Sequence, residues 1–73
     1  LSIYPVPAKN SLTITYKSAI GSLQIYNQLG QEVHKSTGLG PEATVDVSNL
    51  AVGVYILKLF NEKEAKTFKI IKE

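Results

Sequence analysis

Apolar side chains in this chain recur at every second residue. Leu12, Ile14 and Tyr16 alternate with threonines. The same spacing returns at Leu23 and Ile25. A period of two places successive side chains on opposite faces of an extended strand, whereas an amphipathic helix needs a period near 3.6. The pattern therefore predicts strands and disfavours helix throughout.

The alternation and the turn signals within it divide the chain into seven short strands. We expect them at residues 1–4, 12–16, 23–25, 31–36, 44–47, 54–60 and 65–71. Short strands at intervals of about 8 to 12 residues are typical of an antiparallel sandwich. We therefore predict an all-β fold, a seven-stranded antiparallel immunoglobulin-like β-sandwich. A small barrel is the alternative, because it uses the same inward alternation.

Turn residues separate these strands. Residues 27–30 predict a hairpin in which Gly30 takes a positive φ at little cost. Residues 37–41 contain two glycines and a proline, so we expect a loop that joins two sheets or two halves of one. A turn is also expected at residues 48–49, and residues 61–63 should close the last hairpin.

A long apolar strand follows a compact turn motif. Residues 54–60 form a nearly continuous apolar run, which is typical of a central strand covered on both faces. Leu50, Gly53 and Tyr55 resemble the corner of immunoglobulin-like sandwiches, in which the tyrosine hydroxyl returns to the backbone. We interpret these three residues as ones that maintain the fold.

The final strand predicts a basic edge. Lys66 and Lys72 stand at its rims, and Lys69 points to the opposite face. Lysines of this kind protect a sheet edge from pairing with another chain. They could equally serve as a docking site for a partner.

Pro5 and Pro7 lie two residues apart at the end of the first strand. Each proline fixes φ, favours an extended residue before it and removes a backbone donor, so this strand must lie at an edge or end there. One interpretation is an entry clamp that discourages edge pairing. The other is a recognition feature at the junction with an upstream linker.

Length and composition exclude several classes of protein. A chain of 73 residues supports one domain, which buries about 60% of the surface that the unfolded chain exposes. Its net charge of +2 is too small to indicate nucleic-acid binding. The absence of cysteine removes disulfides and thiol chemistry. No apolar run reaches the roughly 18 to 20 residues of a membrane-spanning helix, so we expect no membrane insertion.

Catalytic and cofactor sites are not indicated. The lone imidazole, His34, falls in a strand expected to be exposed, with no acid at a suggestive spacing. The six carboxylates are scattered over turns and strand faces, unlike a glycosidase pair or a metal cluster. Gly38 and Gly40 are not followed by a predicted helix, as a phosphate loop requires. We therefore predict neither an enzyme nor a bound cofactor.

Taken together, these motifs resemble the C-terminal sorting domain of the type IX secretion system (type A, Por secretion family). They run from residues 4–8 through 12–14, 25–31 and 46–55 to the lysines of the last strand. No one motif is distinctive, but their order and spacing cover nearly the whole chain. The family often has Asn between the two prolines, where this chain has Val6.

The resemblance implies a secretion signal and not an enzyme. A domain of this family directs its cargo, the upstream domain of the same chain, through an outer-membrane translocon. We expect residues 1–73 to be a single C-terminal sorting domain, excised from a longer secreted precursor. The cargo is expected in the periplasm during transit and then at the cell surface or outside the cell. A surface sortase commonly removes the domain and anchors the cargo to lipopolysaccharide.

The resemblance also assigns roles to individual residues. Candidates for recognition by translocon components and the sortase are Pro5, Pro7, Lys66, Lys69 and Lys72. Positions that match the family's motifs and shape the fold are Gly30, Leu50, Gly53 and Tyr55.

An immunoglobulin-like or fibronectin-like accessory binding module of a secreted enzyme is the alternative function. Such modules expose aromatic rings to their ligands, and of the six aromatic residues Tyr26 and Phe60 look available. A purely structural spacer is a third hypothesis. It predicts that deletion of the domain changes neither export nor binding.

Overall fold

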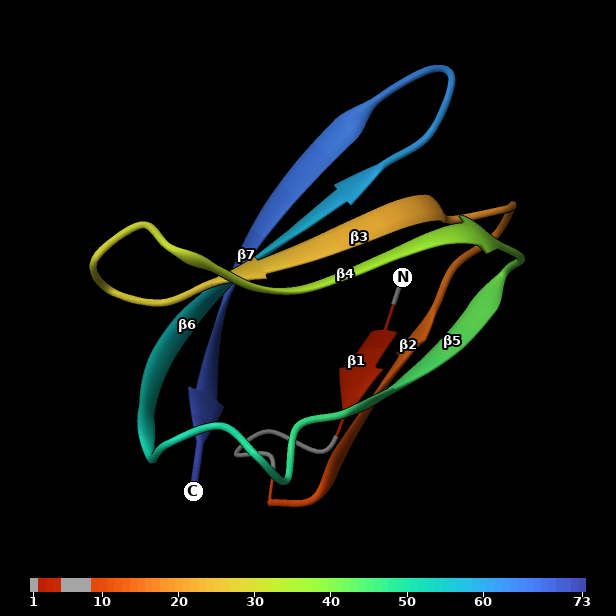
Figure 1. The fold of residues 1–73 in the computed structure, drawn as a ribbon. Coiled ribbons are helices and arrows are strands. Elements are labelled where there is room, and N and C mark those ends of the chain that lie inside the picture. The colour runs from red at the N-terminus through yellow and green to blue at the C-terminus, as the bar shows by residue number, and fades with distance from the viewer. Residues whose placement is uncertain (1, 5–8) are drawn as a thin grey trace.

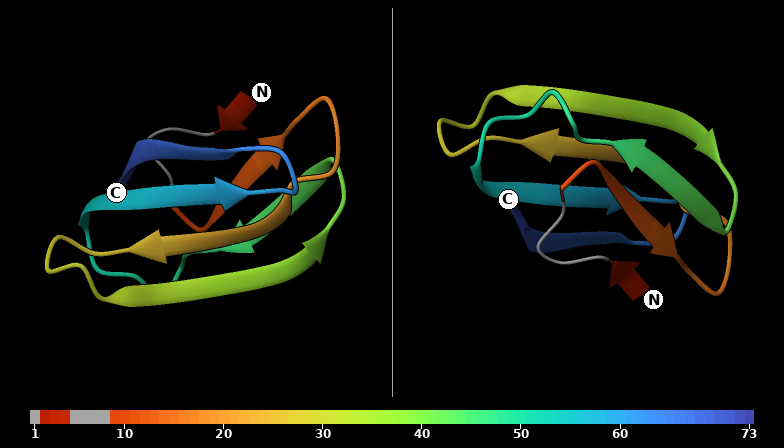
Figure 2. Two further views of the ribbon diagram at one scale, coloured as in Figure 1. Left: turned by 90° about the horizontal axis from the view of Figure 1, so that it is seen from above. Right: turned by 90° about the horizontal axis from the view of Figure 1, so that it is seen from below.

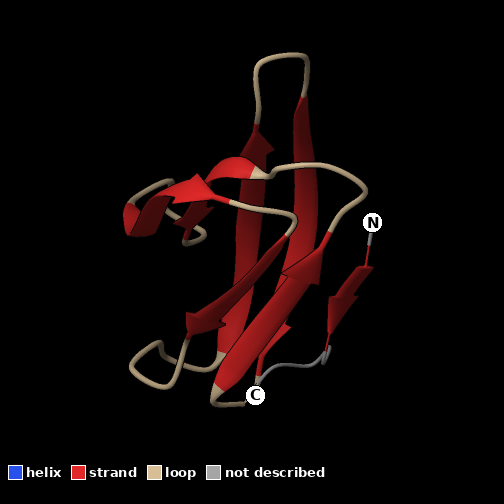
Figure 3. Cartoon of the chain, turned by 90° about the vertical axis from the view of Figure 1, so that its right-hand side faces the viewer, coloured by secondary structure: helices blue, strands red, loops and turns tan. Residues whose placement is uncertain are grey.

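Seven strands form two antiparallel sheets in the computed structural model, which describes residues 2–4 and 9–73 (Figure 1). The strands are β1 (Ser2–Tyr4), β2 (Ser11–Thr15), β3 (Gly21–Tyr26), β4 (Glu32–Leu39), β5 (Glu42–Asp46), β6 (Gly53–Phe60) and β7 (Ala65–Lys72). One sheet has the order β1-β2-β5 and the other the order β4-β3-β6-β7. The described residues form strands and loops and no helix (Figure 3). The predicted sandwich is confirmed, and the barrel is wrong because the strands divide into two separate sheets.

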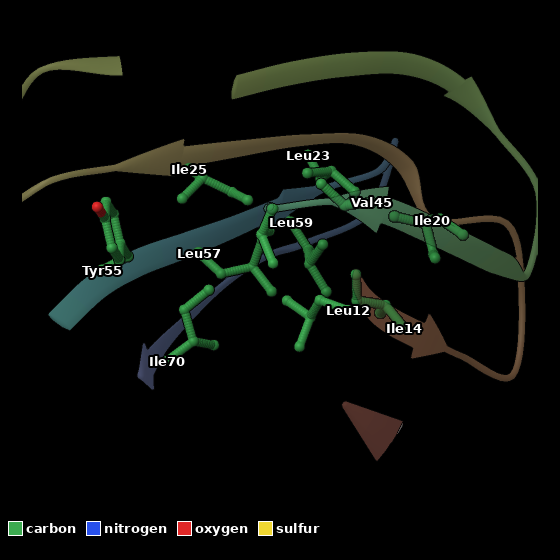
Figure 4. Packing of buried hydrophobic residues seen from close by; sticks show 12 residues of the cluster. Leu12, Ile14, Ile20, Leu23, Ile25, Val45, Tyr55, Leu57, Leu59 and Ile70 are labelled. Atoms are coloured by element: carbon green, nitrogen blue, oxygen red, sulfur yellow. The ribbon is translucent and has the colours of Figure 1, made fainter. Parts of the chain in front are cut away.

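The two sheets face each other and enclose one apolar core. The two views in Figure 2 show β1 on the side of β7 and β5 on the side of β4. Alternate residues of β2, β3, β5 and β6 point inward, as the period of two requires (Figure 4). The buried apolar residues are Leu12, Ile14, Ile20, Leu23, Ile25, Ala43, Val45, Val47, Tyr55, Leu57, Leu59 and Ile70. Full burial of one such aliphatic side chain contributes about 1.5 to 3 kcal/mol.

The connection between the two sheets is shorter than the sequence predicts. The fourth strand extends to Leu39 and takes up most of the loop expected at residues 37–41. In the pairing of β3 with β4, Thr37 and Gly38 together oppose one residue, and Gly38 has a φ of 67°. A bulge of this kind lets glycine remain within a strand. Only Gly40 and Pro41 then separate β4 from β5, and these two strands belong to different sheets as expected.

The central position of β6 is confirmed, but its coverage on both faces is not. Tyr55, Leu57 and Leu59 are buried against the other sheet. Val54 and Ile56 alternate with them and are only half-buried on the outer side. The prediction was wrong because the second sheet lies on one side of β6 alone, and an apolar run cannot show which of its faces is covered.

Asparagine side chains close both hairpins of the four-stranded sheet. The Asn27 Oδ1 atom accepts hydrogen bonds from the backbone N–H groups of Leu29 (2.9 Å) and Gln31 (3.0 Å). The Asn61 Oδ1 atom likewise accepts from the N–H groups two and three residues later, each at 2.8 Å. Gly30 has a φ of 82°, so its predicted left-handed conformation is confirmed. These local bonds replace the ladder bonds that a turn cannot make.

Candidate recognition surface

The Tyr55 side chain ties the crossover between the sheets to β6. Tyr55 is 7% exposed, and its hydroxyl donates a hydrogen bond of 2.7 Å to the carbonyl oxygen of Ala51. Leu50 is half-buried and packs against the core, and Gly53 begins the strand with a φ of 155°. The hydrogen bond from the tyrosine hydroxyl to the backbone, which the sequence predicts, is therefore present. A bond of this kind contributes about 1 kcal/mol.

The same crossover begins with a carboxylate that holds a turn. Asp46 Oδ1 accepts hydrogen bonds from the Ser48 hydroxyl (2.6 Å) and the Ser48 N–H group (2.9 Å). These two bonds, the hydroxyl's first, lower the pKa of Asp46 from its ordinary value. The expected turn at residues 48–49 is present, since the Leu50 N–H group donates to the Val47 carbonyl oxygen at 3.0 Å.

The three lysines of β7 differ in exposure. Lys69 is exposed on the outer side of the sheet. Lys66 and Lys72 alternate with it and lie on the inner side, as the sequence predicts. Lys66 is half-buried, with its Nζ atom 5.6 Å from the centre of the Tyr16 ring. Lys72 ends β7, at the rim as predicted, but it is only 8% exposed, so the exposure expected of an edge lysine is wrong. Its long aliphatic stem is covered, while its Nζ atom donates to the Glu73 carbonyl oxygen at 2.9 Å.

The outer surfaces of the two sheets carry opposite charge. The outward side of β4, β3, β6 and β7 bears Lys35, Lys58 and Lys69, and we call it the lysine face. The outward side of β1, β2 and β5 bears Glu42 and Asp46 among hydroxyl side chains, and we call it the acidic face. We did not predict this contrast between the two faces from the sequence. The sequence does hold a signal for it. A charged residue that stands an odd number of positions from the buried residues of its strand lies on the outer face.

The comparison with protein families matches residues 2–73 to the secretion system C-terminal sorting domain. The chain belongs to this family. Its members are sorting domains of type IX secretion and mark proteins that are exported to the cell surface or secreted. A secretion-signal family is non-catalytic.

One solved structure resembles the sorting domain closely in fold. It is PorZ, described as an essential bacterial surface component of the type-IX secretion system of Porphyromonas gingivalis. The TM-score is 0.82 at 19% sequence identity, and the match covers 99% of the sorting domain and 11% of the PorZ chain. At this identity the likeness shows a shared fold. No curated protein matches the sequence.

His34 of the sorting domain lies on the inner side of β4. It is half-buried, and its Nε2 atom is 2.7 Å from the Ser36 Oγ atom. The expected exposure was wrong because its cross-strand partner is the buried Ile25, and paired residues share a face. Within residues 2–4 and 9–73, no group of three or more His, Asp or Glu side chains could hold a metal ion. No helix in that part of the chain is long and apolar enough to cross a membrane.

The aromatic side chains of the sorting domain are less accessible than a sugar-binding module requires, with two exceptions. Tyr4 is 49% exposed and Phe60 is 36% exposed. We expected Phe60 to be accessible but not Tyr4. We also expected Tyr26 to be accessible, but it is half-buried and has the Lys58 Nζ atom 5.1 Å from the centre of its ring. The double-proline motif, Pro5 and Pro7, lies outside the described residues.

Proposed function

We propose that this sorting domain is recognised as a folded unit by the type IX secretion machinery and directs its cargo through the outer-membrane translocon. The cargo is the upstream part of the same chain, and it passes through the periplasm before it reaches the surface. The observation that carries the proposal is the family match over residues 2–73. The closed apolar core supports it, because a domain with its own core can present a surface independently of its cargo.

The proposal includes two later steps. A cell-surface sortase removes the domain, and the cargo is then anchored at the cell surface. Removal requires the junction with the cargo to be accessible while the sandwich stays folded. In the sandwich, β1 is an edge strand, so the N-terminal end of the chain leaves the fold at a sheet edge. This placement supports cleavage upstream of β1 without loss of the core.

The residues divide into two proposed groups. Those that form the shape are Gly30, Leu50, Gly53 and Tyr55. Those proposed for recognition are Pro5, Pro7, Lys66, Lys69 and Lys72. Among the lysines, Lys69 is the strongest candidate for direct contact, because its side chain is exposed whereas Lys72 is buried.

The test is a fusion of residues 1–73 to the C-terminus of a reporter that carries an N-terminal signal peptide. In a host with the translocon we expect the reporter at the cell surface, and in a host without it we expect the reporter in the periplasm. A protease added to intact cells distinguishes the two locations. Periplasmic retention in both hosts would overturn the proposal. If the reporter reaches the surface with the mass of the uncleaved fusion, the sortase step is wrong and the export proposal stands.

A further inference from the structure

We propose that the lysine face binds a protein segment in which carboxylates stand beside apolar side chains. The inference rests on the proposed function and names the surface through which the machinery would bind the domain. It differs from recognition of the C-terminal lysines as a linear sequence, because two of the three residues on this face, Lys35 and Lys58, lie outside β7.

The three lysines form a compact group although they are distant in the sequence. One cross-strand row consists of Lys35, Gln24, Lys58 and Thr67. The next row consists of Tyr26, Ile56 and Lys69. Neighbouring strands are about 4.8 Å apart, so the backbones at Lys35 and Lys58 are about 10 Å apart. Lys69 is one diagonal step from Lys58, and all three ammonium groups can therefore contact one short segment.

Apolar side chains lie between and beside these lysines. Val54 pairs with Ile71 across β6 and β7, and Ile71 is 44% exposed. A hollow of about 540 Å³ is lined by Tyr26, Val54, Ile56 and Lys58 together with the β3–β4 hairpin. The hollow can bury an apolar side chain of a partner, while Lys58 at its wall and the other two lysines of the face pair with carboxylates. Both parts are needed, since exposed ion pairs by themselves contribute little.

Charge complementarity selects an acidic partner. Among the described residues of the lysine face, Glu32 is the one carboxylate that pairs into the sheet, at the bulge beside Tyr26. The other face has Glu42 and Asp46 on its outward side, and no lysine lies on the described strands there. An acidic segment is attracted to one side of the domain and repelled from the other. Such an arrangement orients the domain and speeds encounter more than it strengthens binding.

The contacts of the Tyr26 side chain favour a protein segment over a glycan as the partner of this face. A sugar binds an aromatic side chain by stacking on the open face of its ring. On Tyr26 the Lys58 ammonium group lies 5.1 Å from the ring centre, and the hydroxyl donates to Gln24 Oε1 at 2.8 Å. The ring is thus engaged by groups of the domain itself. What remains for a partner is the apolar hollow and the positive charge.

The first experiment compares two triple substitutions in the reporter fusion. Lys35→Ser, Lys58→Ser and Lys69→Ser together form the face variant. Lys9→Ser, Lys17→Ser and Lys63→Ser form the control, because these exposed lysines lie in loops and their loss changes the net charge equally. We expect the face variant to lose at least about tenfold in surface delivery and the control variant to match the wild type. Arginine at the three face positions should retain delivery, since arginine keeps the charge.

The outcomes separate this inference from the proposed function. If the wild-type fusion itself stays in the periplasm, the proposed function is wrong. The lysine face is then tested by the peptide-binding experiment described next. If the wild type is delivered and the face variant is delivered equally, the inference about the face is wrong. An equal loss in both variants also overturns it, because net charge would then be the cause. Thermal unfolding of each variant shows that the sandwich is intact.

The second experiment measures binding directly by NMR on the isotope-labelled 73-residue chain. The probe is a synthetic peptide of alternating glutamate and valine, and a peptide of alternating lysine and valine is its control. We expect shifts confined to β3, β4, β6 and β7, weaker binding at high salt, and at least about tenfold weaker binding by the face variant. Equal shifts with both peptides would overturn the inference. Sedimentation that shows a wild-type dimer and a monomeric face variant would assign the face to a second copy and also overturn it.

Discussion

The two sheets of this sorting domain are alike on their inner faces and different on their outer ones. Leu12 and Ile14 of the three-stranded sheet and Leu23 and Leu57 of the four-stranded sheet are all fully buried. Outside, one sheet has hydroxyls and two carboxylates, and the other has three lysines and an apolar hollow that is lined in part by one of them, Lys58. The fold therefore constrains about one residue in two along each strand. The other residues are free to carry a signal.

The largest effect is expected from the inner faces. Leu12→Ala and Leu57→Ala should each destabilise the domain by about 2 to 5 kcal/mol, because each leaves a cavity in the core. Both leucines are 0% exposed, and one lies in each sheet. Either loss is a large fraction of the total stability of about 5 to 15 kcal/mol that is usual for a domain. Urea unfolding followed by circular dichroism measures the two losses. A loss below 1 kcal/mol for one variant alone would contradict the equal roles of the sheets.

A smaller but clear effect is expected where the backbone of the four-stranded sheet is tightly fitted. Gly21 has a φ of 84°, and an added methyl group would collide with the Phe60 carbonyl oxygen. Gly21→Ala should therefore cost more than about 1 kcal/mol. Gly40→Ala is the matched control in the link between the sheets, because nothing lies within 4 Å of an added methyl there. Similar unfolding midpoints for the two variants would show that the sheet relaxes around Gly21.

Two tyrosines test how each end of the core is held. Tyr55→Phe removes the hydrogen bond to Ala51 and should cost about 1 kcal/mol. Tyr16→Phe should cost nothing or stabilise the domain, since the buried Tyr16 hydroxyl has no hydrogen-bond partner within the described residues. Denaturant titration of both variants beside the wild type makes the measurement. A larger loss from Tyr16→Phe than from Tyr55→Phe would reverse the assignment.

The smallest effect is expected at the acidic face. Hydrogen bonds from Ser48 lower the pKa of Asp46, so the unfolded chain binds a proton there more readily than the folded one. The resulting stability is present above the ordinary pKa of 3.8 and is lost as the pH falls through the lower folded value. Ser48→Ala should therefore lower stability slightly at neutral pH, reduce the slope of stability against pH below 3.8 and leave stability at strongly acid pH nearly unchanged. An unchanged acid slope would show that the turn does not depend on this carboxylate.

Much of the structure could be predicted from local patterns in the sequence. The alternation, the turn signals and one continuous apolar run locate all seven strands, although the strand ends shift by up to three residues. Gly30 and the asparagine turns predict both hairpins, because a turn depends on residues that are neighbours in the chain. The hydroxyl of Tyr55 could be assigned to the backbone for the same reason, since Ala51 is four residues away. Such features need no knowledge of what packs against them.

The sequence by itself thus determined the strand pattern, the hairpins and the family of this sorting domain. Only the tertiary structure decided that Gly38 stays within β4, that Lys72 is buried and that the outer side of β6 is half open. It also brought Lys35, Lys58 and Lys69 onto one surface, from strands that are distant in the sequence. The physical reason is that alternation assigns each residue to one of two faces. Which strands pair, and which face meets the other sheet, depends on contacts between segments far apart in the chain.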